Sequence, residues 1–184
     1  ILTDNNAASR FFTENPGLSH DKIVLYLPTF RERDAYIAEQ LKVEFRDVDG
    51  YRLIISAHPL FSKIKIENEF SYSGDFSTYD LMKIADVIIT DYSACAFEAS
   101  VLMKPLYFFV PDYDEYSSER GINVDLKKEM PSATFENAEE LVSAIKLNNY
   151  NFDMLYKFKC EYVENTKANN AEILAKFVSM LLKA

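Results

Sequence analysis

The sequence predicts an α/β protein in which a parallel sheet of buried strands is covered by helices on both faces. Three observations support this fold class. Short apolar runs such as "KIVLYLPT" and "DVIITDY" lack polar alternation, as expected for strands buried on both faces. Between them lie segments whose apolar residues recur every three or four positions, as in amphipathic helices. The two kinds of segment alternate along the chain, which is typical of parallel sheets.

The first half of the chain begins with a polar segment and then alternates between strands and helices. Residues 1–21 contain the turn signal "NPG" and are expected to be a connector or lobe edge, which leaves 22–184 as the folded lobe. Apolar runs predict strands at 22–29 and 51–59, with a weaker strand at 68–73. Apolar residues spaced by four predict a helix at 34–45, and good N-cap candidates begin another at 77–85.

The second half carries the strongest strand and most of the expected helices. Residues 86–92 are the strongest strand signal in the chain, and 105–113 form a further strand after a helix at 93–103. The polar stretch 112–136 is expected to be irregular. Amphipathic spacing then predicts three closing helices, at 137–147, 151–164 and 170–183.

Composition limits the class of protein. The chain has 184 residues, which suits one domain or one lobe of a larger enzyme, and 48% of them are hydrophobic. Its net charge of −9 argues against a non-specific nucleic-acid binder, which needs a basic face. Cys95 and Cys160 are too few for a disulfide framework or a metal cluster, and are expected to be free thiols. No apolar run approaches the roughly 20 residues of a membrane span.

Polar residues follow three of the expected strands. They are "TFR" after the first, "HP" after the second, and "TDYSA" after the strand at 86–92. Because ligands of parallel α/β sheets bind beyond the carboxyl ends of the strands, these sets are expected to converge on one site. Ser93 and the open amides of the following helix suit a phosphate, and the small residues after Ser93 leave room for it. Alternatively, Ser93 only caps the helix.

Three further side chains could complete an anion site. His58 could donate to phosphate or move a proton, and Arg31 and Arg120 could make bidentate phosphate contacts. Each also has an ordinary alternative: local structure for the histidine and a surface charge for each arginine. Glu98 could meet a ribose hydroxyl or point to water, and Lys104 is expected to be structural. No metal site, glycine-rich dinucleotide loop or Walker loop is identified.

Several stretches, in this order, resemble the CDP-glycerol glycerophosphotransferase family of teichoic-acid and capsule polymerases. The resemblance covers residues 22–180, and its most specific part is the long block 77–121. The matching stretches are "LYLPTFRER" (25–33), "AHPLF" (57–61), "STYDLMKIADVIITDYSACAFEASVLMKPLYFFVPDYDEYSSERG" (77–121) and "NAEELVSAI" (137–145).

The resemblance implies a fold, a reaction and roles for residues. It implies the Rossmann-like C-terminal lobe of a GT-B transferase, with the N-terminal lobe missing from this chain. The reaction would pass an alditol phosphate from CDP-glycerol, or another CDP-alditol such as CDP-ribitol, to a polymer hydroxyl, with release of CMP. His58 would be catalytic, and Glu98 would lie at the ribose. The implied donor-phosphate residues are Thr90, Asp91, Tyr92, Ser93, Arg120 and Arg31.

The resemblance also implies partners and a location, and it has departures. The partners would be a nucleotide-activated small molecule, a polymer acceptor and the missing lobe, in a cytoplasmic protein peripheral at the inner membrane face. No cofactor beyond the CDP-glycerol donor is implied, and a divalent metal stays undecided. Ala94 replaces the second serine of the family's "TDYSS", which leaves the identity of the donor open.

Two other functions remain as alternatives. A GT-B glycosyltransferase that uses a nucleotide sugar would share the fold. A phospho-receiver signalling domain is disfavoured, because the first strand is followed by "PTFRER" rather than an acidic pair and "VPDYDEY" stands where a receiver needs its lysine.

Overall fold

The computed structural model describes residues 6–29, 34–56, 76–164 and 170–182, and it contains a parallel five-stranded sheet. The strands are β1 (Lys22–Leu27), β2 (Tyr51–Ile55), β3 (Val87–Thr90), β4 (Leu106–Phe109) and β5 (Thr134–Phe135). Their order in the sheet is β2-β1-β3-β4-β5, and every neighbouring pair is parallel. The predicted fold class is therefore confirmed, while the expected strand at 68–73 lies outside the described residues.

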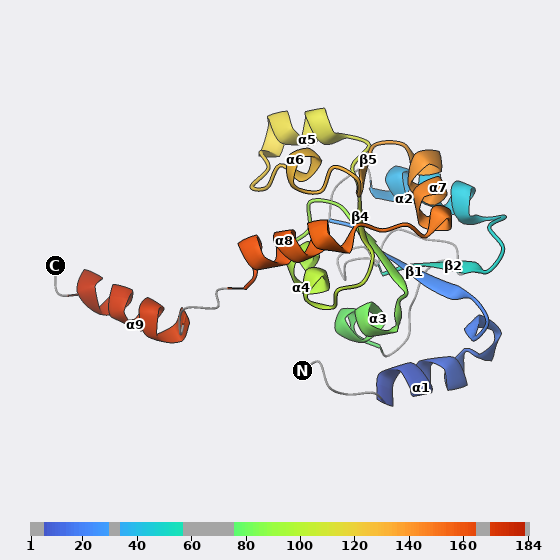
Figure 1. Ribbon diagram of the computed structural model, residues 1–184, viewed down its shortest axis with the longest axis horizontal. Helices are drawn as coiled ribbons and strands as arrows, with labels where there is room; N and C mark the ends of the chain where they lie inside the picture. The colour runs from blue at the N-terminus through green and yellow to red at the C-terminus, as the bar shows by residue number, and fades with distance from the viewer. Residues whose placement is uncertain (1–5, 30–33, 57–75, 165–169, 183–184) are drawn as a thin grey trace.

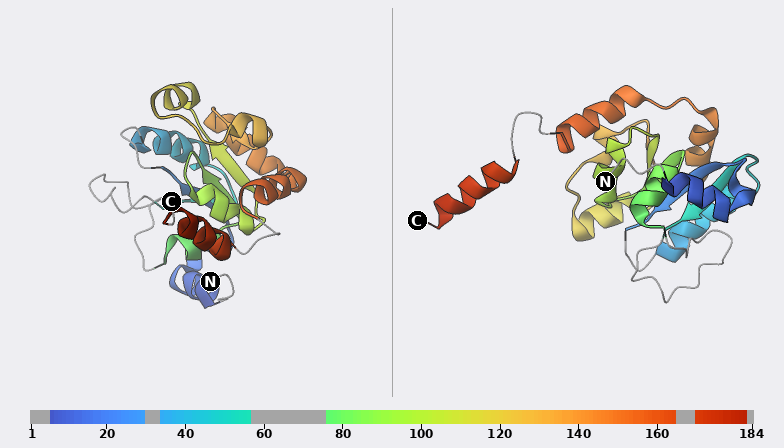
Figure 2. Two further views of the ribbon diagram at one scale, coloured as in Figure 1. Left: turned by 90° about the vertical axis from the view of Figure 1, so that its left-hand side faces the viewer. Right: turned by 90° about the horizontal axis from the view of Figure 1, so that it is seen from below.

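Helices cover both faces of this sheet (Figures 1 and 2). The chain moves from β1 to β2 in one direction and then back across the sheet to β3, so right-handed crossovers place their helices on opposite faces. On one face α2 (Asp34–Phe45) packs against α7 (Ala138–Leu147). The other face carries α3 (Thr78–Ile84), α4 (Cys95–Val101) and α8 (Phe152–Tyr162), with α4 in contact with α8.

The N-terminal residues contribute to the hydrophobic core. Helix α1 (Asn6–Glu14) contacts α3, and a short 3₁₀ helix, η1 (Pro16–Leu18), leads into β1. Phe11 on α1 is fully buried, and its ring meets that of Phe76 edge to face at 5.5 Å between centroids. The guanidinium of Arg10 lies 4.2 Å from the centroid of the same Phe76 ring. Residues before β1 thus pack on the sheet domain through aromatic contacts.

Lys104 has the structural role expected from the sequence. Its ammonium donates to three carbonyl oxygens where α3 ends, those of Met82, Lys83 and Ala85. A helix leaves its last carbonyls without intrahelical partners, and a cation there satisfies them. Burial lowers the pKa of Lys104. The side chain therefore joins the turn before β4 to the end of α3.

The expectation of an irregular segment over 112–136 was wrong. Residues 113–120 form α5 and residues 126–129 form α6, with bounds Tyr113–Arg120 and Leu126–Glu129, and β5 follows. The sequence "YDEYSSER" buries only Tyr113, so it lacks the apolar periodicity that marks the other helices. Helix α6 is a single turn capped by Asp125, whose carboxylate accepts from the backbone N–H of Lys128.

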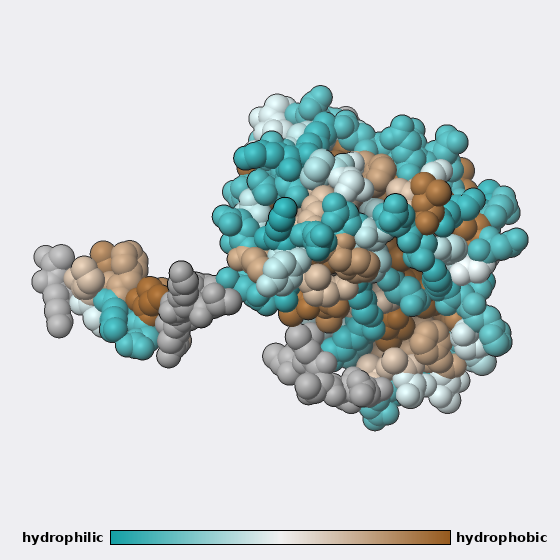
Figure 3. Space-filling view, in the orientation of Figure 1, coloured by the Kyte–Doolittle hydropathy of each residue, from teal (hydrophilic) through white to brown (hydrophobic). Residues whose placement is uncertain are grey.

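The last helix, α9 (Asn170–Leu181), lies apart from the sheet in Figure 1. Its large apolar side chains are exposed, and they are seen as brown atoms on the helix in Figure 3. These residues are Ile173, Leu174, Phe177, Val178, Met180 and Leu181. None of the helices in the described part of the chain is both long enough and apolar enough to cross a membrane.

Candidate functional site

Asp91 and Thr29 join the carboxyl ends of the two central strands. The Asp91 side chain, in a residue 1% exposed, accepts hydrogen bonds from the backbone N–H of Thr29, which lies 3.0 Å from each carboxylate oxygen. The Thr29 hydroxyl also donates to Oδ1 at 2.5 Å. Two of the polar sets expected to converge, "TFR" and "TDYSA", are thus brought together at these residues. A carboxylate engaged in this way holds the two loops together, and a contact of Asp91 with the donor phosphate stays a prediction.

Thr90 also faces inward rather than toward solvent. It is fully buried, and its hydroxyl donates to the carbonyl oxygen of Leu27 at 2.8 Å. This bond lies one residue before the contact between Asp91 and Thr29, so the ends of β1 and β3 are joined at two successive levels. Thr90 therefore helps to hold the ends of β1 and β3 together beneath the site.

Ser93 lies at the start of α4, but the helix amides are not open as expected. The Ser93 hydroxyl oxygen accepts from the backbone N–H of Cys95 at 3.3 Å. The N–H groups of Ala96 and Phe97 donate to the carbonyl oxygens of Ser93 and Ala94, both at 3.1 Å. The expectation of open amides is therefore not met at residues 95–97, while phosphate binding at this helix start stays a prediction. Because the Ser93 oxygen acts as an acceptor toward Cys95, its O–H hydrogen can still be donated to a ligand.

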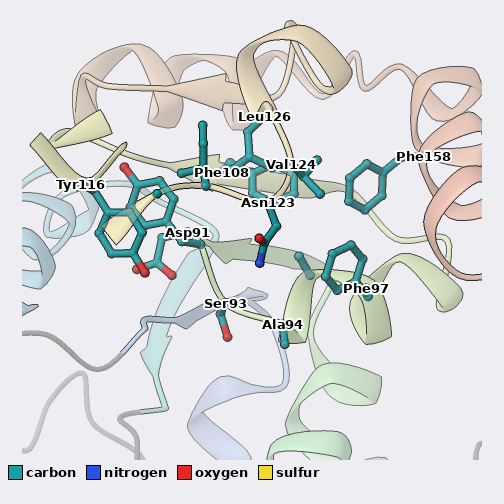
Figure 4. A pocket seen from close by; sticks show the side chains of 14 residues that line it. Asp91, Ser93, Ala94, Phe97, Phe108, Tyr116, Asn123, Val124, Leu126 and Phe158 are labelled. Carbon is teal, nitrogen blue, oxygen red and sulfur yellow. The ribbon is translucent and has the colours of Figure 1, made fainter. Parts of the chain in front are cut away.

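A pocket of about 170 Å³ opens beside Ser93 (Figure 4). Its base is apolar, since Phe108, Leu126 and Phe158 are buried there. Its rim is polar or half-exposed and includes Ser93 and Asn123. The side chains come from the ends of β3 and β4, from α4, α5, α6 and α8, and from the loop between α5 and α6. The full lining is Asp91, Tyr92, Ser93, Ala94, Ala96, Phe97, Phe108, Tyr116, Gly121, Ile122, Asn123, Val124, Leu126 and Phe158.

A pair of stacked tyrosines forms one wall of the pocket. The rings of Tyr92 and Tyr116 are 3.8 Å apart between centroids and nearly parallel, with 8° between their planes. The Tyr92 hydroxyl donates to Asp112 at 3.2 Å, which fixes the ring of Tyr92 relative to the start of α5. Tyr92 therefore lines the pocket, and its contact with a donor phosphate stays a prediction.

A second tyrosine contact holds the loop that closes the pocket. The Tyr113 hydroxyl donates to the carboxylate of Asp125 at 2.9 Å and so links the start of α5 to the start of α6. Burial, reinforced by this bond, raises the pKa of Tyr113 to about 12. Residues 121–124, which lie between the two anchored positions, are thereby held over the pocket.

Arg120 and Glu98 lie around this pocket rather than in its lining. Arg120 is exposed in the last turn of α5, and its guanidinium carbon is 5.9 Å from the centroid of the Tyr116 ring. Glu98 is exposed on α4 and accepts a hydrogen bond of 2.8 Å from the Tyr79 hydroxyl of α3, which raises the pKa of Tyr79. Phe97, the residue before Glu98, instead stacks on Phe158 of α8. The two side chains therefore lie on different sides of α4. Glu98 faces α3, whereas Phe97 faces α8 and lines the pocket.

Two expected site residues, His58 and Arg31, lie outside the described residues. Among the residues that are described, no group of three or more His, Cys, Asp and Glu side chains is placed to hold a metal ion. Sequence reasoning missed Asn123, Tyr116 and Phe158 as pocket residues. The one available signal was Asn123 following the "RG" pair, since a loop after a turn glycine often carries exposed polar groups.

The backbone of Gly121 predicts a specific sensitivity in the pocket loop. Its φ of 75° and ψ of 157° fall in a region that essentially only glycine adopts. A Cβ at this position would meet no atom within 4 Å, so the cost of a side chain is conformational rather than steric. Gly121→Ala is expected to lower the free energy of unfolding by about 1–3 kcal/mol in urea titrations.

Gly17 provides a matched control for this substitution. It also has no atom within 4 Å of a built Cβ, but it has no positive φ. Gly17→Ala is expected to leave stability unchanged or slightly raised. Equal urea midpoints for the two variants would contradict the role given to Gly121.

Comparison with known proteins gives a consistent result. Residues 1–180 match the family described as CDP-Glycerol:Poly(glycerophosphate) glycerophosphotransferase. A teichoic acid ribitol-phosphate primase of Bacillus spizizenii is 32% identical over 94% of this chain and 47% of its own length. A teichoic acid glycerol-phosphate primase of Bacillus subtilis is 29% identical over 90% of this chain and 45% of its own length. The chain thus spans less than half the length of these curated relatives.

Solved structures of the wall teichoic acid polymerase TagF share the fold. A TagF variant soaked with CDPG superposes with a TM-score of 0.69 and 24% sequence identity, over 100% of this chain and 49% of TagF. A second TagF structure gives a TM-score of 0.65 over 100% of this chain and 50% of the other.

Proposed function

This chain belongs to the CDP-glycerol:poly(glycerophosphate) glycerophosphotransferase family, and from that premise we propose that it is the nucleotide-binding, C-terminal lobe of a GT-B enzyme that transfers alditol phosphate. The donor is a CDP-alditol, the acceptor is a hydroxyl of a growing polymer, and CMP is released. The transferase class is supported by relatives named as teichoic acid primases and transferases. The N-terminal lobe would be the part of the relatives that this chain does not match.

One observation carries this proposal. The end of β3 is joined to the end of β1 by Asp91 and Thr29, and immediately beyond this junction Ser93 stands at the mouth of a pocket. This is the edge of a parallel sheet at which ligands bind. The diphosphate of the donor would lie over Ser93, with the hydroxyl as one donor. Arg120, on the exposed end of α5, supplies positive charge from the same side as Tyr116.

The chemistry then rests on positioning and on charge. The acceptor oxygen attacks the phosphorus that bears the alditol, and the bond from that phosphorus to the CMP oxygen breaks, so that CMP leaves with the electron pair. Ser93 and Arg120, with His58 and Arg31, would stabilise charge on the phosphoryl oxygens during the transfer. A base that takes the acceptor proton would come from the other lobe. Glu98 would accept a hydrogen bond from a ribose hydroxyl.

The polymer and the location of the enzyme follow from the proposed reaction. A polymer that grows on a membrane carrier would require the intact protein to lie in the cytoplasm, peripheral at the inner face of the membrane. The proposed partners are therefore the nucleotide-activated donor, the polymer and the N-terminal lobe of the same protein.

Calorimetric binding to the intact protein tests the proposal. CDP-glycerol and CDP are expected to bind, and UDP-sugars are expected to bind at least about tenfold more weakly, because one lost base contact is worth about that much. Tighter binding of a UDP-sugar would instead support a GT-B glycosyltransferase. Absence of binding by every nucleotide would remove the proposed donor site.

A further inference from the structure

The pocket beside Ser93 is too small to bury a whole nucleotide. Its volume is about 170 Å³, whereas sites that bury an entire small-molecule ligand commonly measure roughly 300–1,000 Å³. A donor whose diphosphate lies over Ser93 extends in two directions, with the nucleoside at one end and the alditol at the other. Of the two ends, the alditol is the smaller and suits a space of this size.

The arrangement of α4 separates these two directions. On one side Glu98 faces α3, where its exposed carboxylate accepts from the Tyr79 hydroxyl. On the other side Phe97 and Phe158 stack at the wall of the pocket. An exposed carboxylate such as that of Glu98 suits a ribose diol. The pocket on the other side is left for the transferred group.

Resting on the proposed function, we propose that this pocket receives the alditol of the donor and that Asn123 selects a short alditol. The Asn123 carboxamide lies between the rings of Tyr116 and Phe97 in Figure 4. Among the described residues no side-chain hydrogen bond of Asn123 is formed, so both its donor and its acceptor groups remain for a ligand. A carboxamide supplies both kinds of partner, and a hydroxyl uses both.

The base of the pocket limits the length of the alditol. Beyond Asn123 the lining consists of buried apolar side chains, namely Phe108, Leu126 and Phe158, with Val124 beside them. Glycerol directs its hydroxyls to the rim, where Asn123 and Ser93 lie. The two additional hydroxyl-bearing carbons of ribitol would be pushed against groups that form no hydrogen bonds, and an unpaired hydroxyl there is unfavourable. The pocket therefore favours glycerol over ribitol.

Binding of three ligands to the intact protein tests this assignment by calorimetry: CDP, CDP-glycerol and CDP-ribitol. The unmodified protein is expected to bind CDP-glycerol about tenfold more tightly than CDP-ribitol. Asn123→Ala is expected to weaken CDP-glycerol about tenfold and to leave CDP within about twofold. Asn149→Ala, an exposed asparagine outside the pocket, is the matched control and is expected to change neither ligand.

A second variant tests the apolar limit without removing a polar group. Val124→Thr replaces a methyl group with a hydroxyl at nearly constant volume, and is expected to bring the affinity for CDP-ribitol close to that for CDP-glycerol. Equal loss of CDP and CDP-glycerol in Asn123→Ala would overturn the proposal, because the nucleoside would then occupy the pocket. Tighter binding of CDP-ribitol by the unmodified protein would overturn it as well. In both of these results CDP binds to the unmodified protein. They therefore differ from a failure of the proposed function, in which CDP does not bind at all.

Discussion

Asp91→Ala is expected to lower the free energy of unfolding by about 3 kcal/mol, the largest stability effect predicted for this chain. The carboxylate is almost fully buried and accepts from both the amide and the hydroxyl of Thr29. Alanine removes these acceptors from a buried position and leaves the half-buried amide and hydroxyl of Thr29 without this partner. Equilibrium unfolding in urea, followed by circular dichroism, measures the change.

Two further substitutions assign the effect to this contact. Thr29→Val removes the hydroxyl but keeps the amide, so it is expected to cost less than Asp91→Ala, and the double variant is expected to show non-additive losses. Asp47→Ala, at an exposed turn, is the matched control and is expected to stay within about 0.5 kcal/mol of the unmodified protein. Additive losses at Asp91 and Thr29 would show that the two side chains act independently.

Ser93→Ala is expected to reduce the rate of alditol phosphate transfer by the intact protein about a hundredfold or more, with the fold intact. The hydroxyl stands at the pocket mouth and is half-exposed, and its hydrogen can be donated while its oxygen accepts from Cys95. A donor directed at charge that develops during the reaction lowers the barrier by several kcal/mol at most, and mutation of one such donor commonly costs about 10²–10³ in rate. Transfer of label from CDP-glycerol to polymer measures the rate.

The control for Ser93 is a serine outside the pocket. Ser118→Ala removes a hydroxyl that bonds only a carbonyl within α5, that of Glu115, and is expected to keep full activity. Thermal unfolding of both variants separates loss of catalysis from loss of fold. Unchanged turnover in Ser93→Ala would remove this residue from the site.

Most of the fold follows from periodicity, because strands buried on both faces and amphipathic helices have distinct patterns. The run "DVIIT" became β3 with all four strand residues buried, and the apolar spacing in 137–147 became α7. Helix α5 was not predicted, because seven of its eight residues are not buried. It is anchored at one end by the hydrogen bond from Tyr113 to Asp125. A helix whose residues are mostly polar has no apolar stripe to detect.

The site was less predictable than the fold. The sequence places Thr90, Asp91 and Ser93 at the end of a strand. Every residue of β3 is buried, so the strand has no alternation of polar and apolar residues that would indicate which side chains point inward. The hydrogen bonds to Leu27 and Thr29 decide this, and they depend on strand pairing between distant segments. The pocket base joins Phe108 and Phe158, which lie on separate elements, so no local motif could reveal it.

The central place of β1 has a consequence for how the chain acquires its structure. Both neighbours of β1 come later in the sequence, and the bond from the Ile23 N–H to Asp86 joins residues 63 positions apart. During synthesis, one edge of β1 therefore remains unpaired until β3 has emerged from the ribosome. Parallel pairing at such separation is slow, and an unpaired strand edge is prone to aggregation during this interval.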